Sequence, residues 1–286
     1  MGNKIALVAD STCDLNKELV ERYHVNIVPL HISLGDNMYD DWVTIKPEEI
    51  YEHFYKTKEL PHTAAMSVGE YADVFQKYVD DGYDVIHVSL GSNLSVTNRS
   101  ATLAAQDFDG RVEVIDSCNL STGSGLVVIK IAELIEQGLS LKEVADKARE
   151  LVHKSHASFV IDKLNFLAAG GRCSAVEAFG ANLLGLKPCI EVSTKENGKM
   201  GVGKKYRGKF DKVCIDYLNE IVDKYGEVDT DRVFVTHAGC KDEIVESVRK
   251  ALEDKNIFKE VFVTRASCTI SSHCGPDTLG VIFMTK

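Results

Sequence analysis

The chain has 286 residues, of which 44% are hydrophobic and 27% charged, and its formal net charge is −10 at pH 7. This composition excludes a disordered or fibrous protein, and the length suffices for about two domains. The acidic excess argues against a broad nucleic-acid or anionic-membrane surface, because phosphate groups are met by an excess of Lys and Arg.

No targeting segment or membrane span is predicted from the sequence. The apolar residues after Lys4 end at Ala9, and the apolar stretch 125–135 is interrupted by Lys130 and Glu133. That stretch is also shorter than the roughly 20 residues that a bilayer requires. The eight cysteines form no Cys-x-x-Cys pair. We therefore expect reduced thiols and a cytoplasmic location.

Short apolar runs alternate with segments of helical periodicity along the chain. The expected strands are 4–9, 26–34, 84–88, 111–115, 158–161, 188–194, 199–206, 232–236, 260–264 and 281–285. The expected helices are 15–23, 47–55, 68–78, 101–106, 125–137, a segment beginning at 141, 163–169, 211–225 and 242–253. Strands that alternate with helices predict a parallel sheet covered on both faces. The turn Glu196-Asn197-Gly198 between two strands predicts a hairpin, and so antiparallel pairing, in the C-terminal half.

The fold class that follows is α/β in two domains. Residues 1–157 are expected to form an N-terminal α/β domain with a parallel sheet, and residues 158–286 a C-terminal α/β domain with a mixed sheet. Four residues are expected to cap the first turns of helices: Asp14, Ser67, Ser140 and Asp162.

Residues 89–100 contain a glycine-bearing turn between a strand and the start of a helix. Such a turn directs free backbone N–H groups outward. Four hydroxyl groups would add uncharged donors for a small anion or a carbonyl group: Ser92, Ser95, Thr97 and Ser100. A polar loop with a serine N-cap explains the same residues equally well. Two further polar turns lie around Thr63 and at 271–280, where His273 precedes a Gly-Pro turn.

Three motifs that would indicate a cofactor, a metal or a serine nucleophile are incomplete. Residues 198–205 resemble a P-loop, but Lys205 replaces the Ser or Thr that holds magnesium. His153 and His156 lie about one helical turn apart without a carboxylate or cysteine nearby to complete a metal site. Residues 122–125 lack the first glycine of the G-x-S-x-G nucleophile elbow. No cofactor or metal is predicted.

Taken together and in order, several motifs resemble the DegV family, the fatty-acid-binding proteins that serve bacterial fatty acid kinase. The resemblance covers essentially the whole chain. The motifs are Asp10-Ser11-Thr12 with Asp14-Leu15, Pro61-His62-Thr63, residues 89–101, Asp116-Ser117, residues 164–167 with Gly170-Gly171-Arg172, and His273 with Gly275-Pro276 and Leu279-Gly280-Val281.

The resemblance implies a long-chain fatty acid in an apolar tunnel between or within the two domains. The family's carboxylate-holding threonine and serine fall on Thr63 and Ser95, and its arginine and C-terminal histidine near the head group fall on Arg172 and His273. The family presents the carboxylate to a separate kinase subunit, which supplies ATP and magnesium and makes an acyl phosphate used in phospholipid metabolism. The chain itself is therefore expected not to be an enzyme.

The chain departs from the family pattern near the expected head group. Ala64-Ala65-Met66 stands where Ser-Gln-Pro is common, and Val96 and Asp277 each replace a glycine. These departures leave open the alternative that the protein is a small-molecule sensor with an altered head-group site. A competing hypothesis makes Ser95 and His273 the nucleophile and base of an acyl hydrolase or transferase. A basic cluster could meet the transferred phosphate or an acidic partner, or could be a solvated hairpin edge: Lys204, Lys205, Arg207 and Lys209.

Overall fold

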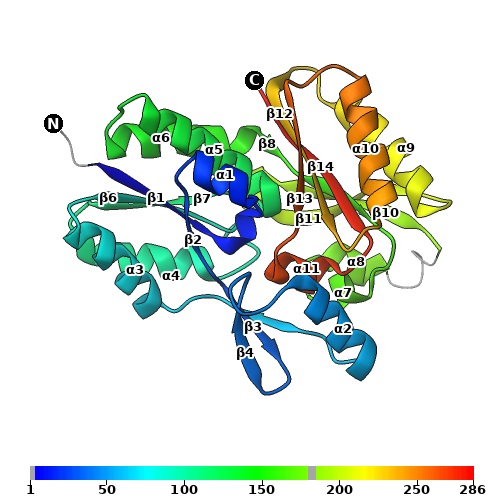
Figure 1. Ribbon diagram of the computed structural model, residues 1–286, viewed down its shortest axis with the longest axis horizontal. Coiled ribbons are helices and arrows are strands. Elements are labelled where there is room, and N and C mark those ends of the chain that lie inside the picture. The colour runs from blue at the N-terminus through cyan, green and yellow to red at the C-terminus, as the bar shows by residue number, and fades with distance from the viewer. Residues whose placement is uncertain (1–3, 180–184) are drawn as a thin grey trace.

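The computed structural model describes residues 4–179 and 185–286, and it confirms the α/β fold class (Figure 1). The strands are β1 Ile5–Asp10, β2 Asn26–Val28, β3 His31–Leu34, β4 Asn37–Asp40, β5 His62–Ala64, β6 Asp84–Ser89, β7 Val112–Asp116, β8 Ser155–His156, β9 Ser158–Ile161, β10 Lys187–Ser193, β11 Lys199–Tyr206, β12 Val228–Ala238, β13 Glu260–Arg265 and β14 Thr278–Thr285. The helices are α1 Lys17–Arg22, α2 Pro47–Thr57, α3 Val68–Asp80, α4 Thr97–Ala105, α5 Ser121–Glu136, α6 Leu141–Leu151, α7 Asn165–Ala169, α8 Ser174–Phe179, α9 Phe210–Lys224, α10 Asp242–Asp254 and α11 Cys268–Cys274.

The N-terminal half contains a parallel sheet in the order β2-β1-β6-β7. The carboxyl ends of its strands meet at one edge of the sheet, where Ser89 pairs with Asp116 and β1 ends at Asp10. Ligand sites of open α/β sheets lie at this kind of edge. The edge thus brings together three of the sequence motifs that are far apart along the chain.

The C-terminal half contains a mixed sheet in the order β11-β10-β9-β14-β12-β13, with β8 also paired to β14. Among the strands that the structure describes, β12 and β13 pair in parallel and the other neighbours in this sheet are antiparallel. The hairpin expected at Glu196-Asn197-Gly198 is present between β10 and β11. Both the parallel and the mixed sheet are therefore as predicted.

A small third sheet, β4-β3-β5, was not predicted. The single strand expected at 26–34 is wrong, because β2 ends at Val28 and β3 begins at His31 in a different sheet. Pro29 lies in the break, and proline has no N–H with which to continue a ladder. The turn expected around Thr63 is strand β5, which pairs with β3 so that Thr63 lies opposite Ile32.

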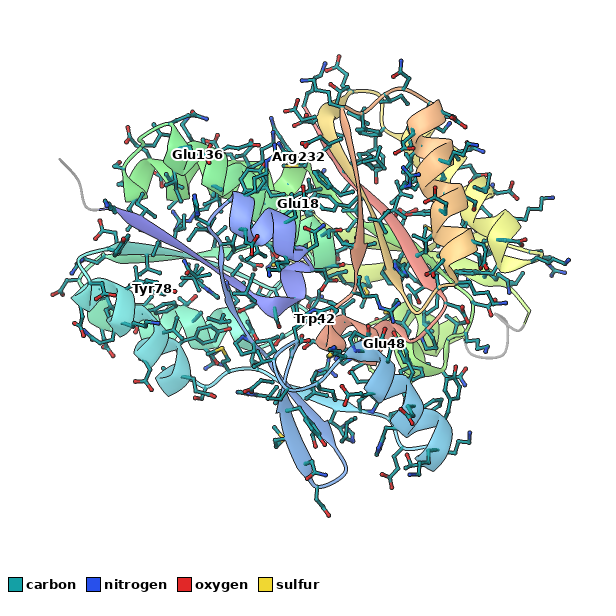
Figure 2. The ribbon with its side chains drawn as sticks, in the orientation of Figure 1. Glu18, Trp42, Glu48, Tyr78, Glu136 and Arg232 are labelled. Atoms are coloured by element: carbon teal, nitrogen blue, oxygen red, sulfur yellow. The ribbon has the colours of Figure 1, made fainter. Side chains whose placement is uncertain are left out.

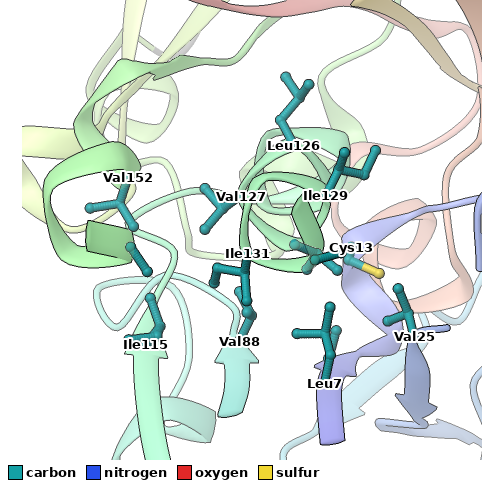
Figure 3. Packing of buried hydrophobic residues seen from close by; sticks show 14 of the residues in the cluster. Leu7, Cys13, Val25, Val88, Ile115, Leu126, Val127, Ile129, Ile131 and Val152 are labelled. Carbon is teal, nitrogen blue, oxygen red and sulfur yellow. The ribbon is translucent and has the colours of Figure 1, made fainter. Parts of the chain in front are cut away.

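Helix α5 packs on both large sheets. Figure 3 shows Leu126, Val127 and Ile131 of this helix in one apolar cluster with Leu7 and Val88 of the parallel sheet. The same cluster contains three side chains of the mixed sheet: Phe234, Ile282 and Met284. Residues before and after position 157 therefore share one hydrophobic core. The division into two domains at that position stays a proposal.

Two of the four expected helix caps are present. Ser67 and Ser140 each form a capping box with the glutamate three residues later. Asp14 and Asp162 are not caps, and both predictions were wrong. Asn16 caps α1 instead, accepting a hydrogen bond from Leu19 N. The Asp14 side chain is buried and reaches across the molecule to α11.

The outer helices carry charged side chains on their exposed faces. Figure 2 shows Glu18 on α1, Glu48 on α2 and Glu136 on α5 at the surface. Of the helices that the structure describes, none is both long and apolar enough to span a bilayer.

Candidate functional site

A cavity of about 490 Å³ lies at the carboxyl edge of the parallel sheet. Its walls come from β5, the turn after β6, residues near α7 and helix α11. All four residues predicted for the head-group site line it: Thr63, Ser95, Arg172 and His273. Residues from four distant parts of the chain therefore meet in one cavity.

Thr63 and His273 are in direct contact, with 2.8 Å between Thr63 Oγ1 and His273 Nε2. The other ring nitrogen, Nδ1, is buried and has no hydrogen-bond partner among the described residues. A proton on Nδ1 would be an unsatisfied buried donor, so we assign the proton to Nε2. In this tautomer the imidazole donates to Thr63 Oγ1, and the Thr63 hydroxyl hydrogen is free to point into the cavity.

The backbone of Gly170 lies close to the imidazole ring of His273. A Cβ atom at Gly170 would lie 2.7 Å from His273 Nδ1, which is closer than such contacts occur. The glycine pair before Arg172 in the sequence motif thus has a steric reason: the first glycine leaves room for the histidine.

The pKa of His273 is lowered from 6.5 to about 4, chiefly by burial and further by the positive charge of Arg172. Burial disfavours the charged imidazolium. The ring is therefore neutral near pH 7 and acts as an uncharged hydrogen-bond donor.

Arg172 lies at the rim of the cavity and is exposed. Its Nη1 donates a hydrogen bond of 2.7 Å to the carbonyl oxygen of Gly170. The guanidinium is thereby tied to the same backbone segment that contacts His273. The positive charge of Arg172 would therefore attract an anion to the entrance of the cavity.

Ser95 is held by the start of α4. Its Oγ donates to Thr97 Oγ1 at 3.1 Å and accepts from Thr97 N at 3.2 Å. No hydrogen bond joins Ser95 to His273 within residues 4–179 and 185–286, and the histidine contacts Thr63 instead. The acyl hydrolase or transferase hypothesis requires that Ser95–His273 contact, and no contact of the described residues favours it.

The backbone N–H groups of the turn between β6 and Ser95 already donate hydrogen bonds to other segments of the chain. The N–H of Leu90 donates to Asp10 Oδ2, and that of Gly91 donates to Asn119 O. The N–H of Ser92 donates to the Asp116 carboxylate, and that of Asn93 donates to Asn197 O. The expectation of free N–H groups is therefore wrong for this part of the turn. Asp10 and Asp116 at the strand ends, Asn119 after β7 and Asn197 of the β10–β11 hairpin accept these hydrogen bonds, so the turn meets a ligand with side chains.

Helix α11 places His273 and was expected to be only a polar turn. Asp41, which the sequence analysis missed, binds its first turn, accepting from Cys268 N at 2.7 Å and from Thr269 Oγ1 at 2.7 Å. Asp41 also accepts from Ser11 Oγ at 2.9 Å, which joins the end of β1 to α11. The chain separation of 227 residues between Asp41 and Cys268 explains why local patterns gave no signal.

Asp14 holds the residue before α11. Its Oδ1 accepts a hydrogen bond of 2.9 Å from Ser267 N, and its Oδ2 accepts from Ser121 Oγ. Burial raises the pKa of Asp14 from 3.8 to about 7. A carboxyl group that titrates near neutral pH thus lies behind the helix that carries His273.

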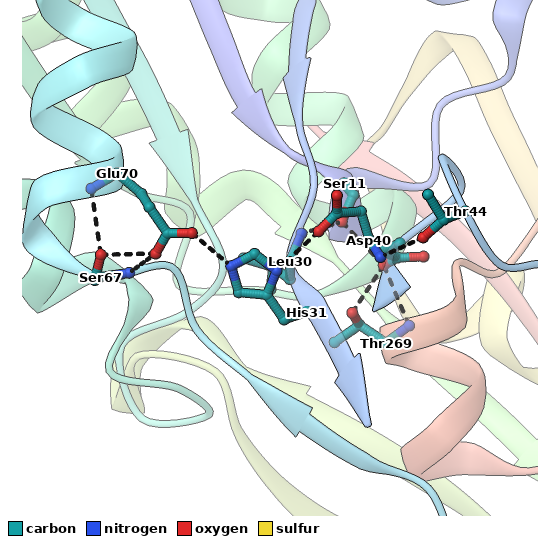
Figure 4. Close-up of polar contacts among 9 residues, drawn as sticks. Ser11, Leu30, His31, Asp40, Thr44, Ser67, Glu70 and Thr269 are labelled. Atoms are coloured by element: carbon teal, nitrogen blue, oxygen red, sulfur yellow. Dashed lines mark hydrogen bonds and ion pairs between the residues drawn. The ribbon is translucent and has the colours of Figure 1, made fainter. Parts of the chain in front are cut away.

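A second network of hydrogen bonds fixes β3 beside the cavity wall (Figure 4). His31 lies between two carboxylates, with Nδ1 2.9 Å from Asp40 Oδ1 and Nε2 2.8 Å from Glu70 Oε1. Glu70 in turn accepts from the backbone N–H of Ser67 at the start of α3. Because β3 pairs with β5, this hydrogen-bond network also fixes the strand that carries Thr63.

A second cavity of about 60 Å³ lies next to the first. Four residues line both cavities, and this set is called the neck below: Leu120, Met200, Ile270 and His273. Beyond the neck the walls are largely apolar and contain small residues such as Ala157, Ala238 and Gly280. A cavity that contains hydroxyl, imidazole and guanidinium groups therefore adjoins an apolar cavity against the mixed sheet.

The departures from the family pattern have different structural meanings. Asp277 adopts a left-handed backbone, φ 57°, which explains why a glycine is common at that position. Val96 has an ordinary helical φ of −76° and is 64% exposed beside the cavity. Ala64 and Ala65 line the cavity without adding a donor, whereas Met66 is buried in the core.

The incomplete motifs of the sequence do not form sites in the part of the chain that the structure describes. The P-loop-like residues run along β11, an antiparallel strand, rather than from a strand into a helix. No cluster of three or more His, Cys, Asp or Glu side chains suited to a metal ion was found among the described residues. In the basic cluster, Lys204 pairs with Glu220, and none of its four members lines the described cavity wall.

Comparison with known proteins places this arrangement among relatives. The family model described as "Uncharacterised protein, DegV family" matches residues 4–286. A DegV domain-containing protein of Clostridium perfringens is 31% identical over 287 residues, covering 99% of each chain. A solved DegV family protein from Thermus thermophilus, described by its fatty acid binding, has a TM-score of 0.90 at 31% identity and covers 99% of this chain and 100% of its own. A stearic-acid-binding protein from Eubacterium ventriosum has a TM-score of 0.81 at 28% identity, covering 100% and 99%.

Proposed function

The chain belongs to the DegV family, and we propose that it binds one long-chain fatty acid, with the carboxylate in the larger of these two cavities and the tail beyond the neck. The observation that carries this proposal is that a cavity with converging polar side chains adjoins an apolar cavity, with four residues lining both. The fatty acid binding described for the solved relatives supports it.

The proposed head-group contacts are mostly uncharged. The Thr63 hydroxyl hydrogen is free for a carboxylate because His273 donates to the Thr63 oxygen. Ser95 would offer its hydroxyl by turning it from Thr97, and Arg172 lies at the rim of the cavity. Neutral donors hold a carboxylate less tightly than a bidentate guanidinium does. An oxygen held in this way keeps more of the electron density that it needs to attack phosphorus.

The tail requires more room than the smaller cavity has in this structure. A volume of about 60 Å³ is only about twice the share of one water molecule in the liquid. We therefore expect the neck side chains Met200 and Ile270 to move when an alkyl chain enters. Burial of the tail would contribute about 0.8 kcal/mol per CH₂ group to the affinity.

The carboxylate is proposed to serve a separate kinase subunit. In that reaction a carboxylate oxygen attacks the γ-phosphorus of ATP, ADP leaves, and an acyl phosphate for phospholipid metabolism results. The family resemblance supports this role, and the sequence offers no complete nucleotide-binding motif of its own. On this proposal the chain is a cytoplasmic binding subunit and not an enzyme by itself.

Native mass spectrometry of the purified protein tests the binding step. We expect a mass that includes one fatty acid, released by denaturation and identified by its own mass. A ligand-free mass, together with no heat of binding for added fatty acid, would contradict the proposal. For the kinase step, we expect acyl phosphate from ATP and fatty acid only when a fatty acid kinase subunit is added.

A further inference from the structure

The tip of the β10–β11 hairpin lies against the turn that leads to Ser95. The backbone carbonyl of Asn197 accepts a hydrogen bond of 3.1 Å from the N–H of Asn93. Asn197 and Gly198 have left-handed backbones, with φ values of 54° and 94°, and these reverse the chain at the tip. A residue of the mixed sheet therefore supplies an acceptor to the head-group turn of the parallel sheet.

Glycines on both sides allow this close approach. A Cβ atom at Gly91 would lie 2.9 Å from Asn197 O and 3.0 Å from Asn119 N, so a side chain there would push the backbones apart. A Cβ atom at Gly198 would lie 3.2 Å from Leu94 Cδ1, which is tighter than most contacts of this kind. The fit between hairpin tip and turn thus depends on two residues without side chains.

The contact acts on Leu94, the residue just before Ser95. Leu94 is 8% exposed and packs in one apolar cluster with Met200 of β11, which lines the neck. Rigid packing of this kind transmits small displacements, because protein interiors are close-packed. A shift of the hairpin tip would therefore move the Ser95 hydroxyl and the neck together.

We propose that Asn197 and Gly198 are positioning residues for the head-group site: the hairpin tip fixes the turn 90–94 and so sets where Ser95 meets the carboxylate. This inference rests on the proposed function. It assigns a role in ligand recognition to a hairpin whose tip does not line the described cavity.

The test compares the wild-type protein with Gly198→Ala in calorimetric binding of hexadecanoic acid and of hexadecan-1-ol. The acid should bind about tenfold more weakly to Gly198→Ala, the equivalent of roughly one hydrogen bond. The alcohol should lose clearly less affinity, because hydrogen bonds between neutral groups are about half as strong as those to a charged group. The Asn93 amide should also exchange faster with deuterium in Gly198→Ala.

Gly208→Ala is the matched control. Gly208 follows the same hairpin, has a φ of 125° and would place its Cβ in open space. It therefore carries comparable backbone strain without touching the turn, and we expect it to bind the acid as the wild type does. Gly91→Ala tests the same contact from the turn instead of the hairpin. Gly201→Ala, whose Cβ also meets no atom, is the control for Gly91→Ala.

Unchanged acid affinity in Gly198→Ala would overturn the positioning role. An equal loss for acid and alcohol would overturn it too, since it would indicate a general structural effect. Wild-type protein that binds neither compound would refute the proposed function itself, which is a distinguishable result.

Discussion

Asp10 accepts a hydrogen bond of 2.9 Å from the backbone N–H of Leu90, which lies 80 residues later in the chain. The bond joins the end of β1 to the turn that leads to Ser95. Asp10 is 1% exposed, and its other carboxylate oxygen accepts from the Tyr71 hydroxyl at 2.7 Å. A single buried carboxylate thus connects the turn, the sheet and helix α3.

Replacement of Asp10 should therefore affect both folding and binding. Asp10→Asn keeps one acceptor oxygen but presents an NH₂ group to Leu90 N–H or to Tyr71 Oη. We expect a loss of about 1–3 kcal/mol in the free energy of unfolding, measured in urea, and weaker binding of fatty acid. Asp107→Asn, at an exposed aspartate, should change neither quantity. Equal stabilities for the two variants would contradict this account of the turn.

The hydroxyl groups of Thr63 and Ser95 should contribute directly to acid binding. Hydrogen bonds to a charged group contribute roughly 1.5–3 kcal/mol each. We expect the double variant Thr63→Val, Ser95→Ala to lose a few kcal/mol of binding free energy for a fatty acid in calorimetry. Ser247→Ala, which removes an exposed hydroxyl on α10, serves as the control. Unaltered affinity in the double variant would remove these two residues from the site.

Gly170→Ala should displace the imidazole of His273. The added methyl group would lie 2.7 Å from Nδ1, so the ring must turn and lose its contact with Thr63 Oγ1. We expect about tenfold weaker acid binding, the scale of one hydrogen bond. Gly226→Ala, where the added carbon meets no neighbour, should bind normally. A crystal structure of Gly170→Ala with the 2.8 Å contact intact would refute the steric argument.

The titration of His273 should be visible by NMR. Its pKa is lowered to about 4, so the ligand-free protein should show the imidazole resonance moving near pH 4, and the His273→Gln spectrum should lack that resonance. A lowered histidine pKa contributes stability that is present above 6.5 and lost as the pH falls through 4. His273→Gln should remove this part of the acid sensitivity, which urea unfolding at pH 7 and pH 4.5 can measure.

Asp14 should act in the opposite direction. Its pKa is raised to about 7, so the protonated carboxyl favours the folded state. That contribution is full below pH 3.8 and is lost as the pH rises through 7. Relative to Asp14→Asn, the wild type should lose stability between pH 5 and pH 8, at about 1.4 kcal/mol per unit of pKa shift. Parallel stability curves for the two proteins over this range would show that Asp14 is not the titrating group.

Local signals in the sequence predicted the elements that depend on neighbouring residues. The capping boxes at Ser67 and Ser140 and the Asn197-Gly198 turn are examples, because the interacting atoms lie within a few residues. Helix α11 was missed. Its segment is short and polar, and its first turn is stabilised by Asp14 and Asp41, more than two hundred residues away.

The meeting of the four site residues could not be derived from periodicity or spacing. Thr63 and His273 are 210 residues apart, and only the resemblance to a family connected them. The polar turn expected after β6 does line the cavity, but its N–H groups are not free as the sequence predicted. The carboxylates of Asp10 and Asp116, which take up the turn's N–H groups, come from strands whose adjacency only the folded sheet reveals.

The position of α5 between the two sheets has a consequence for dissecting this protein. A fragment cut at residue 157 would keep α5 but expose the side of it that faces Phe234 and Ile282. The remaining fragment would expose the matching side of its own sheet. We expect each fragment alone to aggregate rather than to remain a soluble monomer. When the two fragments are co-expressed, they should associate through α5 and become soluble.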